Sequence, residues 1–409
     1  MPVTMQDKTP DEAPRGALDG MRVLDFSRFV AGPYCAMLLG DMGAEVVKIE
    51  RPGAGEVARG VEPGVDGQSY YCFVVNRNKK GLSIDFRSDQ GRAILRDLVA
   101  RADVLVENFR PGVMEAMGLD WPTVQAINPR LVMVRISGFG QDGPLAGRQC
   151  FDAVAQAMSG IMAITGQPGG PPTLAGTTII DYTTGMYGAM GALAALNARH
   201  TTGRGQLVDV SLLDSATSLL LSAIPDQVMG GVRIPLRGNR DRFSAPTNTF
   251  PTADDRWVLI NCAEDAMFGR MTAAMGQPAL AQDPRFADVQ ARLAHVEALE
   301  ALIADWTRTL DADEVVAAMD RANVPSAKVA TMDEVIANQQ LRHRGQITEI
   351  AHQSGARVTA QGVTMHLSDT PLTIRRALPY VGEHSDEILT AWLGYSPQSV
   401  NDLKIRGII

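Results

Sequence analysis

The stretch MRVLDFSRFVAGPYCAMLLGDMGAEVVKIERP, residues 21–52, decides the fold class of this chain. MRVLDFS is a short apolar run typical of a strand. AGPYCAMLLGDMG predicts a helix that begins at Gly-Pro and stops at Gly43, since glycine favours helix ends. AEVVKIERP predicts a second strand. A strand, a helix and a strand in succession are the repeating unit of a parallel sheet.

The same alternation continues along the first half of the chain. We expect strands in GLSIDF (81–86), DVLVENF (103–109) and RLVMVRISGFG (130–140), and helices in DQGRAILRDLVARA (89–102) and WPTVQAINP (121–129). This pattern predicts an α/β fold with a Rossmann-like, doubly wound parallel sheet. Ligands of such sheets bind beyond the carboxyl ends of the strands. The loops to inspect are therefore RFVAGPY (28–34), ERPGAGE (50–56), ENFRPGV (107–113) and SGFGQDG (137–143).

At 409 residues, two domains are expected. Residues 1–20 are polar and contain proline, which predicts a disordered lead-in. Residues 21–221 form the N-terminal part of the large domain, and 222–242, rich in Gly, Pro and Arg, form a linker. Residues 243–330 form a smaller α+β domain, with a hairpin expected in FPTADDRWVLINCA (250–263). A return linker is expected at the start of residues 331–409, and the family resemblance given below implies that these residues form the C-terminal part of the large domain.

Composition excludes several classes of function. The formal net charge of −8 argues against nucleic acid or an anionic membrane as a partner. The four cysteines lie far apart without a CxxC or Cys/His spacing, so we predict reduced thiols and no metal site. The sequence has neither an apolar signal-peptide core nor a run near the roughly 18 apolar residues of a membrane span. A cytoplasmic protein is expected.

One acid stands out in TLAGTTIIDYTTGMYGAMGALAAL, residues 173–196. Asp181 follows an apolar, β-branched run and precedes a glycine-rich helix pattern. One interpretation is structural, because Asp is a favoured N-cap. The other is functional, because a carboxylate between a strand's end and a helix's start faces the ligand cleft, beside unpaired N–H groups that could stabilise an oxyanion. Gly185, Gly188 and Gly191 would let a backbone or a narrow ligand approach closely.

Taken together, the motifs resemble one family from Met21 onward. They are VLDFSRFVAGPYCAMLLGDMGAEVVKIERPGAGE, NRNKKGLSIDF, DVLVENFRPGVMEAMGL, FDAVAQAMSGIMAITG, the Asp181 segment, TGRGQLVDVSLLDSA and VGEHSDEIL, in this order. Together they resemble the class III CoA-transferases, the formyl-CoA and carnitine CoA-transferase (CaiB/BaiF-like) family.

The resemblance implies that Asp181 is a nucleophile that forms an acyl anhydride and then an aspartyl-CoA thioester. CoA would move from a donor, expected to be succinyl-CoA or another short dicarboxylyl-CoA, to a carboxylic acid acceptor. The CoA thioester is then a substrate, and no permanently bound cofactor is expected. The resemblance also implies an interlocked homodimer, with acyl-CoA and small carboxylic acids as the other partners.

Binding residues follow from the same resemblance, position by position. Phe29 and Val30 match positions beside the pantetheine, and Arg51 matches an arginine near the nucleotide. Ile84 to Arg87, with Asn108, Phe109 and Arg110, match loops at the adenosine and phosphate end. Taken individually, Phe29, Val30 and Phe109 are residues that more often belong to a core. Ala116 stands where many relatives carry a basic residue, so Arg110, Lys79 or Lys80 is expected to substitute.

Substrate-pocket candidates are Phe151, Asp152 and Arg240, with Arg237 and Arg242 as further candidates for a second carboxylate. An acyl-CoA racemase of the same fold is an alternative, but racemases place a His before this Asp and the chain has Phe151. A non-catalytic CoA-binding protein is another alternative, although it need not keep Asp181. GAGEVARG lacks the GxGxxG spacing of a dehydrogenase, and no glycine-rich loop follows Arg242 as in formyl-CoA:oxalate enzymes.

Overall fold

The computed structural model describes residues 16–409. The lead-in expected over residues 1–20 lies outside the described residues as far as position 15. Residues 17–20 form a turn in which Leu18 N donates to Met42 O. The chain divides into two compact units: unit 1 contains residues up to Ile161, Ala175–Leu221 and Gln339–Ile409, and unit 2 contains Met162–Leu174 and Ser222–Asn338.

Unit 1 is built on a six-stranded sheet with the strand order β5-β2-β1-β6-β7-β8. Every pairing in it is parallel. Its strands are β1 (Arg22–Asp25), β2 (Glu45–Glu50), β5 (Lys79–Ser83), β6 (Val104–Glu107), β7 (Val132–Ser137) and β8 (Leu207–Ser211). The predicted parallel α/β sheet is confirmed. β3 (Gly64–Val65) and β4 (Gln68–Ser69) form a separate pair. In the six-stranded sheet the chain passes from β1 through β2 to β5 and then crosses to β6 on the other side of β1, so the strand order reverses between β1 and β6.

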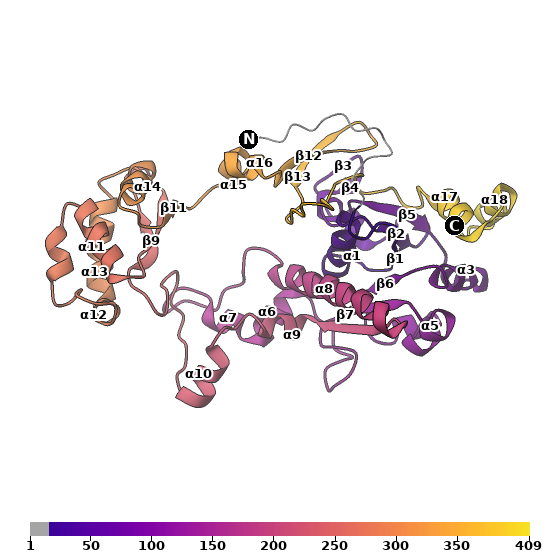
Figure 1. Ribbon diagram of the computed structural model, residues 1–409, viewed down its shortest axis with the longest axis horizontal. Coiled ribbons are helices and arrows are strands. Elements are labelled where there is room, and N and C mark those ends of the chain that lie inside the picture. The colour runs from indigo at the N-terminus through magenta and orange to yellow at the C-terminus, as the bar shows by residue number, and fades with distance from the viewer. Residues whose placement is uncertain (1–15) are drawn as a thin grey trace. The chain divides into compact units, whose positions relative to one another are not determined.

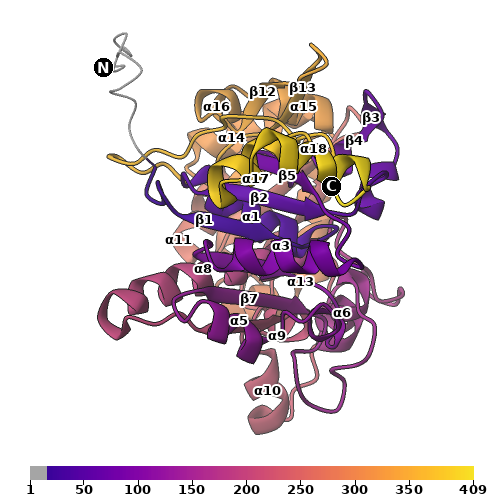
Figure 2. The same cartoon turned by 90° about the vertical axis from the view of Figure 1, so that its right-hand side faces the viewer.

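Helices cover both faces of this sheet (Figures 1 and 2). They are α1 (Ala31–Asp41), α3 (Asp89–Val99), α5 (Trp121–Ile127), α6 (Asp152–Ser159), α8 (Ile179–Thr202), α9 (Leu212–Thr217), α17 (Ser385–Leu393) and α18 (Pro397–Ile405). Adjacent strand residues point to opposite faces. Val23 therefore joins a core with α1 and α8, whereas Leu24 joins a core with α3, α17 and α18. Both cores consist of buried apolar side chains, as expected of a parallel sheet that helices cover on both faces.

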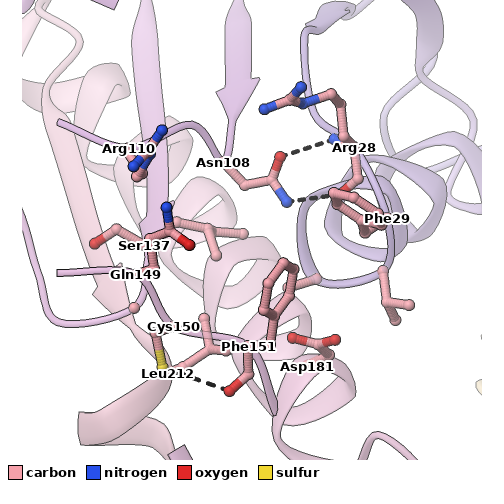
Figure 3. Close-up of a pocket in the computed structure, with 14 residues that line it drawn as sticks. Arg28, Phe29, Asn108, Arg110, Ser137, Gln149, Cys150, Phe151, Asp181 and Leu212 are labelled. Carbon is pink, nitrogen blue, oxygen red and sulfur yellow. Dashed lines mark hydrogen bonds between the residues drawn. The ribbon is translucent and has the colours of Figure 1, made fainter. Parts of the chain in front are cut away.

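Buried acids at the ends of β1 and β6 shape the loops that follow. Asp25 Oδ1 accepts from Ser27 N at 2.9 Å, and Glu107 Oε2 accepts from Phe109 N at 2.7 Å. Asn108 then ties the two loops together, because its side-chain amide bonds both Arg28 N and Arg28 O at 2.7 Å (Figure 3). The two loops therefore lie side by side where the strand order reverses, the usual ligand position in such sheets.

Unit 2 contains a three-stranded antiparallel sheet, ordered β11-β10-β9. Its strands are β9 (Thr247–Pro251), β10 (Trp257–Asn261) and β11 (Ser326–Lys328), and its longer helices are α10 (Ala223–Gly230), α11 (Asp265–Ala274), α13 (Val296–Thr307) and α14 (Ala312–Arg321). β9 and β10 form the predicted hairpin, with Asp255 at φ 55° in its turn. Phe250, Ile260 and Phe268 belong to a separate core. No helix among residues 16–409 combines the length and apolar character needed to cross a membrane.

Candidate active site

A pocket of about 240 Å³ lies at the carboxyl ends of β1, β6 and β7 (Figure 3). The loop after β1 and the start of α1 form one wall, and the loop after β6 forms another. Asp181 and Phe151 come from the starts of α8 and α6. The pocket is lined by Arg28, Phe29, Val30, Ala31, Asn108, Arg110, Ile136, Ser137, Gly138, Gln149, Cys150, Phe151, Asp181 and Leu212.

Asp181 lies in the first turn of α8, not at its N-cap. Thr178 is the N-cap residue and its side chain caps nothing, so the N-cap interpretation of Asp181 is wrong. Residues 173–178, just before the helix, form no strand either. The backbone N–H groups of Ile180 and Asp181 donate to Asp152 Oδ2, at 2.7 and 3.1 Å. These two amides are therefore occupied and cannot serve an oxyanion as the sequence suggested.

Asp152 is thus the true cap of α8, supplied by a different helix. It is the first residue of α6 and is buried. Its Oδ1 accepts from Gln156 Nε2 at 2.5 Å, and Gln156 Oε1 accepts from Ala175 N at 3.0 Å. Both oxygens of Asp152 are engaged in holding the approach to Asp181. Asp152 is a positioning residue in this arrangement and does not line the pocket.

The environment of Asp181 disfavours its ionised form. Burial is the largest cause and the nearby charge of Asp152 the second, and together they raise the pKa of Asp181 to about 7. A carboxyl group with a pKa near neutral is a common property of catalytic groups. Desolvation also makes the ionised carboxylate more reactive toward an electrophile than it would be in water.

The glycines of α8 serve packing within unit 1. A Cβ on Gly185 would lie 2.6 Å from Ala31 O, and one on Gly191 would lie 2.5 Å from a methyl of Val208. Close backbone approach, one of the two expectations for these residues, is therefore what they provide. Because Gly185 admits the start of α1, it brings Ala31 into the same pocket as Asp181.

Unpaired positive charge gathers at the other end of the pocket (Figure 3). Arg28 and Arg110 line the pocket, and neither forms an ion pair with a described residue, although the charge of Glu56 attracts Arg28. Arg28 lies over the ring of Phe109, 4.8 Å from its centroid. Burial, and then repulsion by Arg110 and Arg51, lower the pKa of Arg28 even though Glu56 opposes this. An anionic ligand would relieve this repulsion.

The structure brings six of the predicted residues into this pocket: Phe29, Val30, Asn108, Arg110, Phe151 and Asp181. Ile84, Phe109 and Asp152 are buried and do not line it. Arg51 and Arg87 are exposed outside its lining, and Arg51 Nε donates to Gly55 O at 2.9 Å. Both polar atoms of the Asn108 side chain bond the backbone of Arg28. The Asn108 amide is therefore already engaged within the protein before any nucleotide binds.

Two expected substitutes for the basic residue absent at Ala116 are wrong. Lys79 is fully buried and pairs with Asp25 at 2.7 Å. Lys80 pairs with Glu45 and Glu387. Only Arg110, of the three candidates, lines the pocket with its charge uncompensated.

The arginines expected to hold a second carboxylate lie in unit 2. Arg240 pairs with Glu300, with Nε 2.9 Å from Oε2, and Arg242 pairs with Asp226. Arg237 and Arg240 line a separate pocket of about 240 Å³ within unit 2. Arg237 Nε is buried there without a hydrogen-bond partner among the described residues.

Sequence reasoning missed Arg28, Ser137, Gln149 and Cys150 as lining residues. Arg28 and Ser137 lie in RFVAGPY and SGFGQDG, two loops that the carboxyl-end rule had already selected. The rule predicts which loops lie near a ligand, but it does not predict which side chains of a loop line the pocket. Gln149 and Cys150 carried no signal, since they lie in the loop just before Phe151, the N-cap residue of α6.

Comparison with known proteins assigns the family. The model of CoA-transferase family III matches residues 18–385. A succinyl-CoA–D-citramalate CoA-transferase of Chloroflexus aurantiacus is 39% identical over 97% of this chain and 99% of its own length. A formyl-CoA:oxalate CoA-transferase of Rhodopseudomonas palustris is 32% identical over 96% and 97%. The crystal structure of a CAIB/BAIF family protein from Brucella suis superposes with a TM-score of 0.84 at 34% identity, covering 92% and 100%. The chain therefore belongs to CoA-transferase family III and is an enzyme of this class.

Proposed function

We propose that this enzyme transfers CoA from succinyl-CoA to a small dicarboxylic acid, with Asp181 as the nucleophile. The observation that carries the proposal is one pocket that combines Asp181, its pKa raised to about 7, with the guanidinium groups of Arg28 and Arg110, which form no ion pair with a described residue. The names of the similar enzymes support the substrate class, since they include a succinyl-CoA–D-citramalate CoA-transferase and a subunit of a succinyl-CoA–L-malate CoA-transferase.

The proposed reaction consists of four acyl transfers that need no external acid or base. An Asp181 oxygen attacks the thioester carbonyl, the C–S bond breaks, and CoA thiolate leaves a mixed anhydride. The thiolate then attacks the Asp181 carbonyl carbon, which forms an aspartyl-CoA thioester and releases the donor carboxylate. The acceptor carboxylate attacks this thioester and expels the thiolate. The thiolate finally attacks the acceptor's acyl carbon, and Asp181 is regenerated.

The two ends of the pocket suit the two ends of a CoA thioester. Arg28 and Arg110 would bind phosphate, since guanidinium groups bind phosphate oxygens in pairs. Phe29 and Phe151, whose rings meet edge to face at 5.8 Å, offer an apolar wall for the pantetheine chain between the phosphates and Asp181. This assignment needs no metal or resident cofactor.

A racemase is not favoured by the same geometry. Two-base proton exchange at an α-carbon needs a second base beside the aspartate. The position before Asp152 is Phe151, and both oxygens of Asp152 are occupied by Gln156 and by the start of α8. A CoA-binding protein without catalysis would not require the desolvated carboxylate of Asp181.

We also propose that the active form is a homodimer of the interlocked kind that the resemblance implies. Along α8, Ile179, Met186, Tyr187 and Met190 are each at least 37% exposed, and Met190 reaches 62%. A row of large apolar side chains on one helix is typical of a surface that another chain covers. Some similar enzymes are named as α and β subunits, so a related partner chain is an outcome that the test must allow.

The decisive experiment is intact-mass analysis of the enzyme incubated with succinyl-CoA, with and without hydroxylamine. We expect a CoA or succinyl adduct on the wild type, converted by hydroxylamine to a hydroxamate that peptide mapping places on Asp181. Asp181→Ala should form no adduct and should lose on the order of 10⁴-fold or more in kcat. Asp97→Ala, at an exposed acid of α3, is the control and should behave as wild type. An adduct that persists in Asp181→Ala would refute the assignment.

A further inference from the structure

One wall of the pocket has an unusual backbone. Phe29 has φ 63°, in the left-handed region that bulky residues rarely adopt. It is neither a glycine nor an Asn or Asp, so nothing in its own chemistry favours this conformation. Strained residues of this kind persist only where their surroundings hold them.

A buried ion pair between Glu56 and Lys48 bonds the backbone of Phe29. Phe29 N donates to Glu56 Oε2 at 2.9 Å, and Glu56 Oε1 accepts from Lys48 Nζ at 2.7 Å. Lys48 Nζ also donates to Ser27 O at 3.0 Å. Both side chains of the pair are buried, with 0% and 2% of their surface exposed. The pair is therefore hydrogen-bonded to the backbone of this segment at Ser27 and at Phe29, on either side of Arg28.

The pair is itself fixed by its neighbours. Glu56 N donates to Glu50 Oε1 at 3.0 Å, and Glu50 forms a buried ion pair with Arg59 at 2.6 Å. Burial alone would lower the pKa of Lys48, but Glu56, Asp25 and Glu50 outweigh burial and keep that pKa raised, so Lys48 stays charged. Buried ion pairs contribute little net stability compared with apolar residues of the same size. The contribution of these ion pairs here is to fix the position of the Glu56 carboxylate.

The held segment leads directly into the site. Val30 is the N-cap residue of α1 and Ala31 its first residue, and both line the pocket with Phe29 and Asp181. The turn at Phe29 sets where its ring meets Phe151 and where the first turn of α1, whose N–H groups lack intrahelical partners, faces the pocket. Misplacement of such groups by about 1 Å can lower a rate by about 100-fold.

We propose that Glu56, bound to Lys48, is a positioning residue for CoA transfer that holds Phe29 in the left-handed conformation. Glu56 does not line the pocket and touches no reacting atom; it acts through the Phe29–Ala31 segment. The inference rests on the proposed role of Asp181.

Two substitutions of Glu56 test it. Glu56→Gln keeps the size and removes the charge, and Glu56→Asp keeps the charge beside Lys48 but withdraws the carboxylate from Phe29 N. We expect each to lower kcat about 10- to 100-fold, with KM for succinyl-CoA within about threefold of wild type. The rate of adduct formation on Asp181 should fall by the same factor. Glu56→Asp, which keeps a negative charge beside the buried Lys48, is expected to lose less thermal stability than Glu56→Gln.

A double-mutant cycle separates positioning from simple structural support. Glycine adopts positive φ readily, so Phe29→Gly removes the need for Glu56 to hold residue 29. Glu56→Gln should then lower kcat less than about threefold when it is made in Phe29→Gly. The control is Asp41→Asn, which removes a buried acid paired with Arg77 away from this loop and should lower the melting temperature while kcat stays within about threefold.

Each other outcome has a distinct meaning. If Glu56→Gln lowers kcat equally in the wild type and in the Phe29→Gly variant, or if Asp41→Asn lowers kcat as much, the role is structural and the inference is wrong. If only KM rises, Glu56 supports binding and the inference is again wrong. If the wild type forms no adduct on Asp181, the proposed function fails first and the inference falls with it.

Discussion

At the residue scale, the ionisation of Asp181 should set the pH dependence of the enzyme. The attacking group is the carboxylate, and burial together with Asp152 raises the pKa of Asp181 to about 7. We therefore expect kcat/KM to rise with pH through about 7 and to level off above it. Initial rates between pH 5.5 and 8.5, in buffers of constant ionic strength, check this. A profile that is flat down to pH 5.5 would mean that the free enzyme keeps Asp181 ionised.

Asp152→Asn should move that profile to lower pH. The substitution keeps an oxygen that can accept the amides of Ile180 and Asp181, but it removes the negative charge that disfavours ionised Asp181. The acid limb should shift downward without disappearing, because burial is the larger cause. Asp152→Ala also removes the cap and should cost about 1 kcal/mol in the free energy of unfolding, as measured by urea denaturation. An unshifted limb in Asp152→Asn would exclude the charge of Asp152 as a cause.

The same carboxylate should destabilise the folded protein at alkaline pH. Its folded pKa of about 7 lies above the ordinary 3.8, so the cost of ionisation is absent below pH 3.8, grows as pH rises toward 7, and is complete above 7. Asp181→Asn should therefore be more stable than wild type by about 1–3 kcal/mol at pH 8, allowing for partial solvent screening. The difference should shrink at pH 5. Chemical denaturation at both pH values would show a constant difference if the pKa were ordinary.

How far the sequence could predict this site depends on how far apart its parts lie in the chain. Asp181 and the four loops follow from local patterns and family resemblance, because strand ends and helix starts are written in neighbouring residues. The cap of α8 by Asp152 could not be predicted, since it joins residues 29 positions apart. The burial of Lys79 against Asp25 could not be predicted for the same reason. A charged run is typical of a solvent-exposed surface, and its partner Asp25 lies far away in the sequence.

At the element scale, the contact between α1 and α8 should be sensitive to single methyl groups. A Cβ on Gly185 would lie 2.6 Å from Ala31 O, a distance that requires the two helices to separate. We expect Gly185→Ala to destabilise by about 1–3 kcal/mol and to lower kcat, because α1 carries one pocket wall and α8 carries Asp181. Gly269→Ala in α11 is the matched control, since nothing lies within 4 Å of its Cβ. That change should be neutral or stabilising by up to about 1 kcal/mol.

The elements themselves were largely predictable, and for a physical reason. Consecutive residues such as Val23 and Leu24 enter cores on opposite faces of the sheet, so most of the strands are largely apolar and are flanked by helices. The strand Leu207–Ser211 did not stand out, because at the sheet's edge its Asp209 is exposed and breaks the run. β5 begins at Lys79, two residues before the strand expected over 81–86, because an apolar pattern does not include the two lysines at its start.

At the scale of the whole molecule, the proposed homodimer predicts a dependence of assembly on the exposed face of α8. Met190 is 62% exposed on that helix, and a charge there would meet an apolar partner surface. We expect Met190→Glu to shift the protein from dimer to monomer in light scattering and to lower the proportion of folded, active enzyme. In the proposed interlocked dimer each chain is held by its partner, so loss of assembly should also lower the melting temperature.

Ile405→Glu provides the matched control for this prediction. Ile405 is 76% exposed on α18, so the substitution places the same charge at a similarly apolar surface position. It should leave the mass in solution and kcat unchanged if the α8 surface is the specific interface. A monomeric wild type with full activity would exclude the homodimer. If the wild type and both variants are dimers, the interface does not include this face of α8, because an interface there would not tolerate a buried, unpaired carboxylate at position 190.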